Sequence, residues 1–221
     1  MFLRCAVGLT AMVLYFSALS KISIGQAVTL QYTAPLFVAL LSGKVLAERV
    51  SPGVAVLVIT AFAGIVLIVS PDLGSVEPDA LLALGSGLFA ALAYLLVREL
   101  RKTDSAASVV FWFAIASVAG SVVQAAPDLF SLDRQTLAAL VGIGIGAGGG
   151  QVGITLGYQK AKAAYVGAFS YLTVIVATAG AFFVFGETLS TADWIGGLLI
   201  VGSGVALVFM VPAGDEKTSQ H

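Results

Sequence analysis

The chain has 221 residues, of which 59% are hydrophobic and 25 are glycine, while only 10% are charged. Soluble domains carry about 25% charged residues, and a soluble domain of this length could not hide so much apolar surface from water. Disorder is excluded because it requires low hydrophobicity and high net charge. The net charge of −1 also excludes a strongly basic nucleic-acid-binding protein. The composition therefore predicts an integral membrane protein.

Apolar runs predict eight transmembrane helices, each near the 20 or so residues that a spanning helix needs. The runs do not alternate apolar and polar residues as the strands of a barrel do, so the expected fold is an all-α, polytopic membrane helix bundle. The first run also resembles a signal peptide, but it is long for one and seven spans follow it. The expected spans are approximately Phe2–Leu19, Ala27–Leu46, Pro52–Ser70, Ala80–Val97, Val109–Ala126, Leu137–Tyr158, Val166–Phe185 and Trp194–Val211.

The lysines and arginines between the spans predict the orientation in the membrane. With eight spans, both termini lie on the same side, and that side holds nine of the eleven basic residues. Only Lys21 and Arg134 fall on the other side. We therefore expect a multi-pass protein of the cell (inner) membrane with both termini in the cytoplasm.

The chain contains an internal repeat, in which Lys21–Ser51 matches Lys160–Ser190 at one constant offset. The two stretches agree in their hydropathy, their helix ends and the place of a tyrosine. The offset carries the second span onto the seventh, and an odd number of helices inverts the copy in the membrane. Inverted repeats are typical of secondary transporters. The identities are Lys21 and Lys160, Tyr32 and Tyr171, Glu48 and Glu187, and Ser51 and Ser190.

The repeat also has an implication for the length of the chain. The second copy begins near Asp79, so its counterpart would begin about 60 residues before Met1, a distance that corresponds to about two spans. The sequence thus predicts an inverted five-helix repeat whose first copy is truncated. The expected parts are a three-helix first copy at 1–71, a five-helix second copy at 79–211 and a polar cytoplasmic tail at 212–221.

Two stretches of the sequence resemble a known transporter family. Ala18–Ser23, Leu30–Leu36 and Ala47–Arg49 look like the first EamA domain of the drug/metabolite transporter (DMT) superfamily. Tyr165–Glu187, followed by Thr188-Leu189-Ser190, looks like the same region of the second EamA domain. The resemblance implies a ten-helix secondary carrier of small metabolites, often an exporter, and this chain departs from it by lacking the first two helices.

Acidic residues are absent from the middle of every predicted span. Proton-coupled carriers usually keep an ionisable group inside the membrane, so this pattern favours uniport or exchange. Glu48 and Glu187 are the two acids related by the repeat, and they are open to a structural role at the interface or to a role in gating or ion coupling.

Glycines crowd the sixth predicted span. Gly144, Gly146 and Gly149 match a dinucleotide-binding fingerprint formally, but the required strand and acidic residue are missing. Small residues spaced by four instead allow close approach of helix backbones, and they could also bend the helix near a substrate. The glycines with this spacing form two series, one of Gly142, Gly146 and Gly150 and one of Gly149, Gly153 and Gly157.

Amides and aromatic side chains within the spans are the candidate substrate path. A buried amide is costly unless it is hydrogen-bonded, so Gln31 and Gln151 should face the interior. Pro35 frees a backbone carbonyl and predicts a kink in the second span. For the aromatic residues, an interfacial belt or core packing is the alternative. The candidates are Gln31, Tyr32, Gln151, Tyr171, Tyr15, Tyr94 and Trp112.

These features predict a secondary transporter, expected to be an exporter, of small organic metabolites that works by alternating access. A cavity lined by amides, hydroxyls and aromatic rings, without fixed charge, suits a neutral or zwitterionic solute. The alternative is a non-transporting membrane subunit or an inactive fragment. No enzyme activity, cofactor, metal or nucleic acid is expected, because the single histidine is His221 and no phosphate-binding loop is present. The expected partners are the lipid bilayer and an unidentified small molecule, and a homodimer could complete the cavity.

Overall fold

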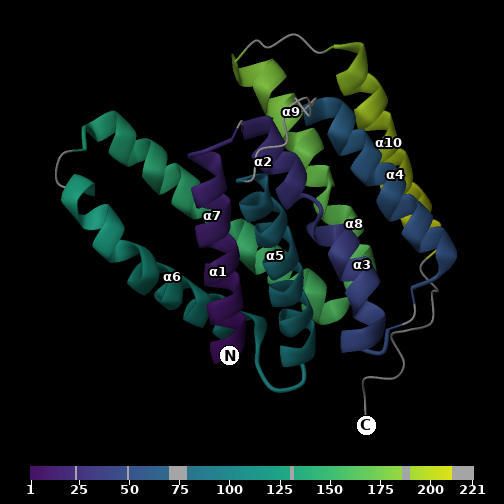
Figure 1. Cartoon of the computed structure of the whole chain (residues 1–221), viewed down its shortest axis with the longest axis horizontal. Helices are drawn as coiled ribbons and strands as arrows, with labels where there is room; N and C mark the ends of the chain where they lie inside the picture. The colour runs from purple at the N-terminus through teal and green to yellow at the C-terminus, as the bar shows by residue number, and fades with distance from the viewer. Residues whose placement is uncertain (23, 49, 70–78, 130–131, 186–189, 211–221) are drawn as a thin grey trace.

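The computed structural model describes residues 1–22, 24–48, 50–69, 79–129, 132–185 and 190–210, and within them the chain is all-helical (Figure 1). The predicted helix bundle is therefore confirmed. The helices are α1 (Phe2–Leu19), α2 (Ile24–Gln31), α3 (Ala34–Val45), α4 (Pro52–Val69), α5 (Ala80–Leu100), α6 (Ala106–Leu129), α7 (Arg134–Lys160), α8 (Ala163–Ser170), α9 (Leu172–Phe185) and α10 (Thr191–Met210).

Three described helices, α1, α5 and α7, are long and apolar enough to cross a membrane on their own. Two predicted spans are each divided between two helices. The span expected at Ala27–Leu46 consists of α2 and α3, and the span expected at Val166–Phe185 consists of α8 and α9. Each break therefore falls inside an apolar run that hydropathy alone treats as one helix.

The first break has a local cause in the residues around Pro35. A proline has no backbone N–H, so the Gln31 carbonyl loses the partner that a continuous helix would give it. The Thr33 hydroxyl donates to the Leu30 carbonyl oxygen at 2.6 Å, which offers this carbonyl an alternative to helical pairing. Pro35 then occupies the first turn of α3, where its missing N–H costs nothing.

The second break occurs without a proline. The Ser170 hydroxyl donates to the Gly167 carbonyl oxygen at 2.6 Å, and Tyr171 separates α8 from α9. Local bonding of this kind competes with the helical ladder. The two breaks fall at matching positions, because the repeat offset carries the bounds of α2 onto those of α8 and the first residue of α4 onto that of α10.

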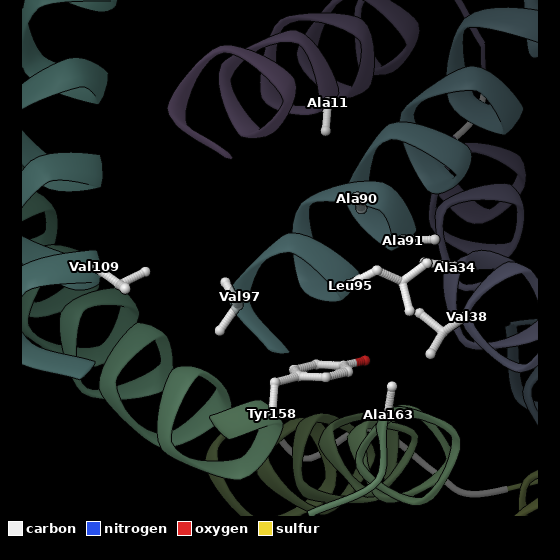
Figure 2. Close-up of a cluster of buried hydrophobic side chains, with 10 residues drawn as sticks. All are labelled: Ala11, Ala34, Val38, Ala90, Ala91, Leu95, Val97, Val109, Tyr158 and Ala163. Atoms are coloured by element: carbon white, nitrogen blue, oxygen red, sulfur yellow. The ribbon is translucent and has the colours of Figure 1, made fainter. Parts of the chain in front are cut away.

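The central helix of the bundle is α5, which packs against α1, α2, α3, α7 and α8. Figure 2 shows the cluster around the second half of α5, where Leu95 and Val97 lie close to Tyr158 of α7. Val38 of α3 and Ala163 of α8 lie toward the hydroxyl end of the Tyr158 ring. Small residues on α5 make this possible, because Ala90 and Ala91 let neighbouring helices approach closely.

A second pair of helices, α4 and α10, packs side by side along one edge of the bundle (Figure 1). Gly64 and Gly196 form a close crossing, since a Cβ added at Gly64 would lie 2.6 Å from the Gly196 carbonyl oxygen. Gly53, at the start of α4, lies beside Met210, at the end of α10. The two helices are therefore antiparallel.

Helices α6 and α7 diverge from the rest of the bundle toward their connection (Figure 1). The N-terminus of α7 is capped by Asp133, whose carboxylate accepts a hydrogen bond from the Thr136 backbone N–H at 3.1 Å. The hydrogen bonds from Thr136 lower the pKa of Asp133. Along α7, residues 134–150 are exposed within the described chain.

Candidate functional site

The two helix breaks meet inside the bundle. The Tyr171 hydroxyl donates a hydrogen bond to the Tyr32 carbonyl oxygen at 3.1 Å. The two rings also touch, with centroids 6.2 Å apart and planes at 48°. Tyr171 is fully buried and Tyr32 is half-buried. The structure thus brings together two tyrosines that occupy the same position in the two copies of the repeat.

Helix α5 covers the first break with small residues. The fully buried Ser86 hydroxyl is hydrogen-bonded to Gln31 Oε1, and it also lies 2.7 Å from the Ala83 carbonyl oxygen. Gly87 lies directly against the break, because a Cβ there would come within 2.7 Å of Thr33 Oγ1. Gln31 therefore faces the interior, as an amide in an apolar span should.

Pro35 is buried where α3 meets α8. A Cβ added at Gly167 would lie 3.3 Å from the Pro35 Cβ atom, so the proline ring packs against the backbone of α8. Pro35 follows the break at Tyr32 and Thr33 instead of bending a continuous helix. The proline therefore acts on the site by ending α2 and by fixing the contact with α8.

Gln151 of α7 lies opposite an arginine. Its Oε1 atom is 3.5 Å from Nη2 of Arg4, which projects inward from the first turn of α1. The Arg4 guanidinium also lies over the ring of Phe113, with Cζ 3.7 Å from the centroid. Only 3% of Arg4 is exposed. The interior of the bundle therefore contains a fixed positive charge.

Tyr94 of α5 stacks on Tyr158 of α7, with ring centroids 4.8 Å apart and planes at 10°. The Tyr158 hydroxyl is buried and has no hydrogen-bond partner within the described chain. Tyr94 lies near Arg4 and near Tyr32, and Tyr158 lies near Tyr171. Tyrosines thus connect the arginine to the two breaks.

The remaining aromatic candidates lie at the margin of this group. Tyr15 is half-buried on α1 and packs against the cluster that contains Ala27 of α2 and Ala83 of α5. Trp112 lies on the outer side of α6 with 51% of its surface exposed, and its ring meets only the edge of Phe111 among the described aromatic contacts. The structure therefore brings Tyr15 toward the site and leaves Trp112 outside it.

The glycines of α7 have few neighbours within the described chain. A Cβ at Gly142, Gly146, Gly150 or Gly153 would meet nothing within 4 Å, whereas one at Gly157 would lie 3.0 Å from Val166. Close packing at the first four glycines therefore stays a prediction.

Glu48 takes part in a buried ion pair at one end of the bundle. Its Oε1 atom accepts from Nε of Arg98 at 2.7 Å, and its Oε2 atom accepts from the Ala163 backbone N–H at 2.9 Å, at the start of α8. Nη1 of Arg98 donates to the Gln159 carbonyl oxygen at 3.0 Å, at the end of α7. Glu187, its counterpart in the repeat, lies outside the described residues.

Sequence reasoning does not select four residues that the structure places in or next to these contacts. Arg98 pairs with Glu48 across 50 positions of sequence, and no local pattern signals such a pair. Arg4 counts among the basic residues flanking a span, although it lies within the apolar run of α1 and a charge there is a usable signal. The four residues are Arg4, Ser86, Arg98 and Tyr158.

The arrangement suits binding and movement of a solute better than chemistry. Within the described chain no group of three or more His, Cys, Asp or Glu residues could hold a metal ion. The polar groups that converge are an amide, hydroxyls, an arginine and the backbone of two broken helices, as in the broken helices of transporters. Fold and site together define a multi-pass membrane transport protein.

Comparisons with known proteins agree with this class. Residues 1–70 and 78–210 match the model of the EamA-like transporter family. The chain therefore belongs to the EamA-like transporter family. The relatives that it matches are transporters and not enzymes.

Two relatives illustrate the range of the family. The chain is 27% identical over 206 residues to the pseudopaline exporter CntI of Pseudomonas aeruginosa, covering 92% of this chain and 72% of the relative. It is 28% identical over 201 residues to a riboflavin transporter of Vibrio cholerae, covering 90% of this chain and 67% of that transporter. A solved crystal structure that is 22% identical in sequence superposes with a TM-score of 0.82. The match covers 94% of this chain and 75% of the chain in that structure, which shows that the fold is shared.

Proposed function

We propose that the chain is a secondary transporter that moves small organic solutes across the membrane by alternating access between two inverted repeats. The observation that carries this proposal is the contact between the two helix breaks, where the Tyr171 hydroxyl meets the Tyr32 carbonyl oxygen. Broken helices place unpaired backbone groups near the middle of a membrane, where transporters bind their solutes. Gln31 and Ser86 add polar groups beside the same point.

Helix boundaries and packing support the inverted repeat. The offset that separates Lys21 from Lys160 relates α2 to α8 at both ends and α4 to α10 at their first residues. Counterparts related by inversion run in opposite directions, and α4 and α10 do pack antiparallel. On this basis we assign residues 1–71 to the first repeat, 79–211 to the second and 212–221 to a polar tail.

The placement in the membrane follows from the basic residues. Nine of the eleven lysines and arginines fall on the side that holds both termini in an eight-span arrangement. By the positive-inside rule this distribution supports cytoplasmic termini, and we propose the cell membrane as the location.

The solute class and direction of transport draw on the relatives. One relative is named an exporter of pseudopaline and another a transporter of riboflavin. We propose export of a small organic metabolite for this chain, by uniport or exchange. The absence of acidic residues from the middle of the predicted spans supports this choice over proton coupling through a buried carboxylate.

A flux assay tests the proposal. The full chain is reconstituted into liposomes that are loaded with neutral, zwitterionic and anionic organic solutes, riboflavin included, and efflux is compared with protein-free liposomes. We expect faster efflux of at least one solute and a loss of at least about tenfold in Gln31→Leu, because an interior amide that positions the solute is removed. Phe183→Leu, on the exposed side of α9, is the matched control and should keep the wild-type rate.

The outcomes separate transport from its alternatives. If no solute leaves faster than from protein-free liposomes while the protein is folded, the chain is a non-transporting subunit or an inactive fragment. If Gln31→Leu transports as well as Phe183→Leu, the site at the breaks does not bind the solute.

A further inference from the structure

Two arginines are buried in this bundle, and their surroundings differ. Arg98 is 7% exposed and is neutralised by Glu48, while Nη1 donates to carbonyl oxygens at the end of α7. Arg4 is 3% exposed, yet none of the ion pairs formed by the described residues involves it. Arg98 is therefore a compensated structural charge, and Arg4 has no neutralising counterpart in the described part of the chain.

The hydrogen-bonding capacity of Arg4 is also largely unused. Its Nε and Nη1 atoms are buried and have no hydrogen-bond partner within the described chain. Among the described residues its guanidinium has one polar contact, from Nη2 to Gln151 Oε1, and at 3.5 Å it is at the limit of hydrogen bonding. The ring of Phe113 offsets part of the charge through a cation–π contact. A guanidinium with two such nitrogens can still bind an anion.

The inward position of Arg4 is not explained by its place near the end of a helix. Long basic side chains at helix ends normally extend toward water. Here the neighbouring apolar residues Phe2 and Leu3 are 88% and 61% exposed, while the arginine beside them is buried. The helix therefore turns its charge inward and its apolar residues toward lipid. The apolar residues are favourably placed there, but a buried charge costs free energy unless it has a partner or a ligand.

The bundle provides a specific place for the guanidinium. A Cβ added at Gly8 would lie 2.9 Å from Nη1 of Arg4 and 2.8 Å from the ring of Phe113. Only a glycine one turn above the arginine leaves this space open. Gln151 faces the same group from α7, and Tyr94 lies within electrostatic range from α5. Residues of α1, α5, α6 and α7 thus converge on one cation.

We infer that Arg4, together with Gln151, binds the oxyanion group, carboxylate or phosphate, of an organic solute that this protein transports. The inference rests on the proposed function and narrows its solute class to anionic or zwitterionic molecules. Arginine recognises carboxylates and phosphates through charge-assisted hydrogen bonds, which are about twice as strong as neutral ones. The tyrosines between Arg4 and the helix breaks give the rest of the molecule an aromatic surface.

A pair of isosteric probes tests the site. The full chain in phosphatidylcholine nanodiscs is titrated with benzoate and with its neutral counterpart benzamide, and binding is measured by calorimetry. We expect benzoate to bind and benzamide not to bind. Arg4→Gln should weaken benzoate binding by about tenfold or more, because a charged hydrogen bond is lost, and Arg4→Lys should retain part of it. Arg101→Gln, at an exposed arginine that follows α5, is the matched control.

A second arm separates a solute from a lipid headgroup as the source of the anion. The thermal midpoint of unfolding is compared in phosphatidylcholine and phosphatidylglycerol nanodiscs, without benzoate. If phosphatidylglycerol raises the midpoint of the wild type but not of Arg4→Gln, and benzoate does not bind, the ligand is an anionic lipid headgroup and the solute site is overturned. Equal benzoate binding by wild type and Arg4→Gln overturns it as well.

The stability of the empty protein provides an independent check. Removing an uncompensated buried charge should leave the midpoint of Arg4→Gln at or above that of the wild type, whereas a structural arginine would lower it. Failure of the site and failure of transport give different results. Benzoate binding that depends on Arg4 without solute efflux keeps the site and removes the transport proposal, and efflux unaffected by Arg4→Gln does the reverse.

Discussion

The buried pair between Glu48 and Arg98 allows the sharpest prediction from this structure. Glu48→Gln keeps the shape of the side chain and an oxygen for the Ala163 backbone N–H, but removes the negative charge from Arg98. Both side chains are mostly buried, at 14% and 8% exposure, so water replaces the lost partner poorly. We expect a large loss of stability from this single change of charge.

The magnitude follows from the contacts that are lost and kept. Removing one member of a buried ion pair costs about 3–5 kcal/mol, because the other charge stays buried without its partner. Arg98 keeps its bond to the Gln159 carbonyl oxygen, and the amide oxygen introduced by Glu48→Gln can still accept from Ala163. The lower end of the range therefore applies, and we expect a decrease of about 3 kcal/mol in the free energy of unfolding.

Cys5 provides the assay. It is the single cysteine of the chain and is buried, so a thiol-reactive dye labels it when the protein unfolds. The matched control is Glu99→Gln, which breaks an exposed pair with Lys102. The Glu99 side chain is 50% exposed and the Lys102 side chain 60%. Exposed pairs contribute about 0–1 kcal/mol, and the control should stay within this range.

The result also decides between the two roles expected for Glu48. A structural role predicts that Glu48→Gln loses stability while the folded fraction keeps its efflux rate. A gating role predicts altered efflux at full folding. If Glu48→Gln and Glu99→Gln unfold at the same denaturant concentration, the buried-pair reasoning is refuted.

Further predictions use the same thiol-labelling assay. Tyr171→Phe removes the hydroxyl that binds the Tyr32 carbonyl oxygen and should cost about 1 kcal/mol; no change would mean that water satisfies this carbonyl. Gly87→Ala should cost at least about 1 kcal/mol, because its Cβ would meet Thr33. Gly146→Ala has open space and should gain about 0.5–1 kcal/mol, and a loss would show that another helix packs there. Lys21→Ala breaks an exposed pair with Asp79 and should change stability by less than about 1 kcal/mol.

Composition and periodicity are sufficient to predict the all-helical membrane bundle. Apolar runs of about 20 residues have few other solutions, because backbone groups inside a bilayer must be paired within the segment. Pro52 opens α4 at the expected residue, whereas α7 begins at Arg134, after the Asp133 cap and before the expected start at Leu137. These signals are local, and a single sequence contains them.

The helix breaks are only partly predictable. Pro35 marks the first one, although the chain breaks at Tyr32 and Thr33, before the proline. At the second break the local signal is the bond from the Ser170 hydroxyl to the Gly167 carbonyl oxygen, and Ser86 makes the same kind of bond within α5, which does not break. The offset of the repeat supplies what local pattern lacks, because it transfers the first break from Tyr32 onto Tyr171. The repeat therefore predicts the position of the second helix break, which a hydropathy average over the apolar run does not show.

The two buried arginines show why the charged part of the site escapes sequence reasoning. The orientation prediction counts Arg4 and Arg98 as basic residues near span ends, and they do lie in the first turn of α1 and the last turn of α5. Whether such a side chain reaches water or turns inward depends on what packs around it. Arg98 turns inward because Glu48, distant in sequence, lies there with a negative charge. Arg4 turns inward onto Phe113 and Gln151, and it forms no ion pair with any described residue. The expectation of a cavity without fixed charge considers only uncharged candidate residues. Arg4 adds a buried cation that no described residue neutralises, so a carrier with this interior should select solutes that bring a negative charge.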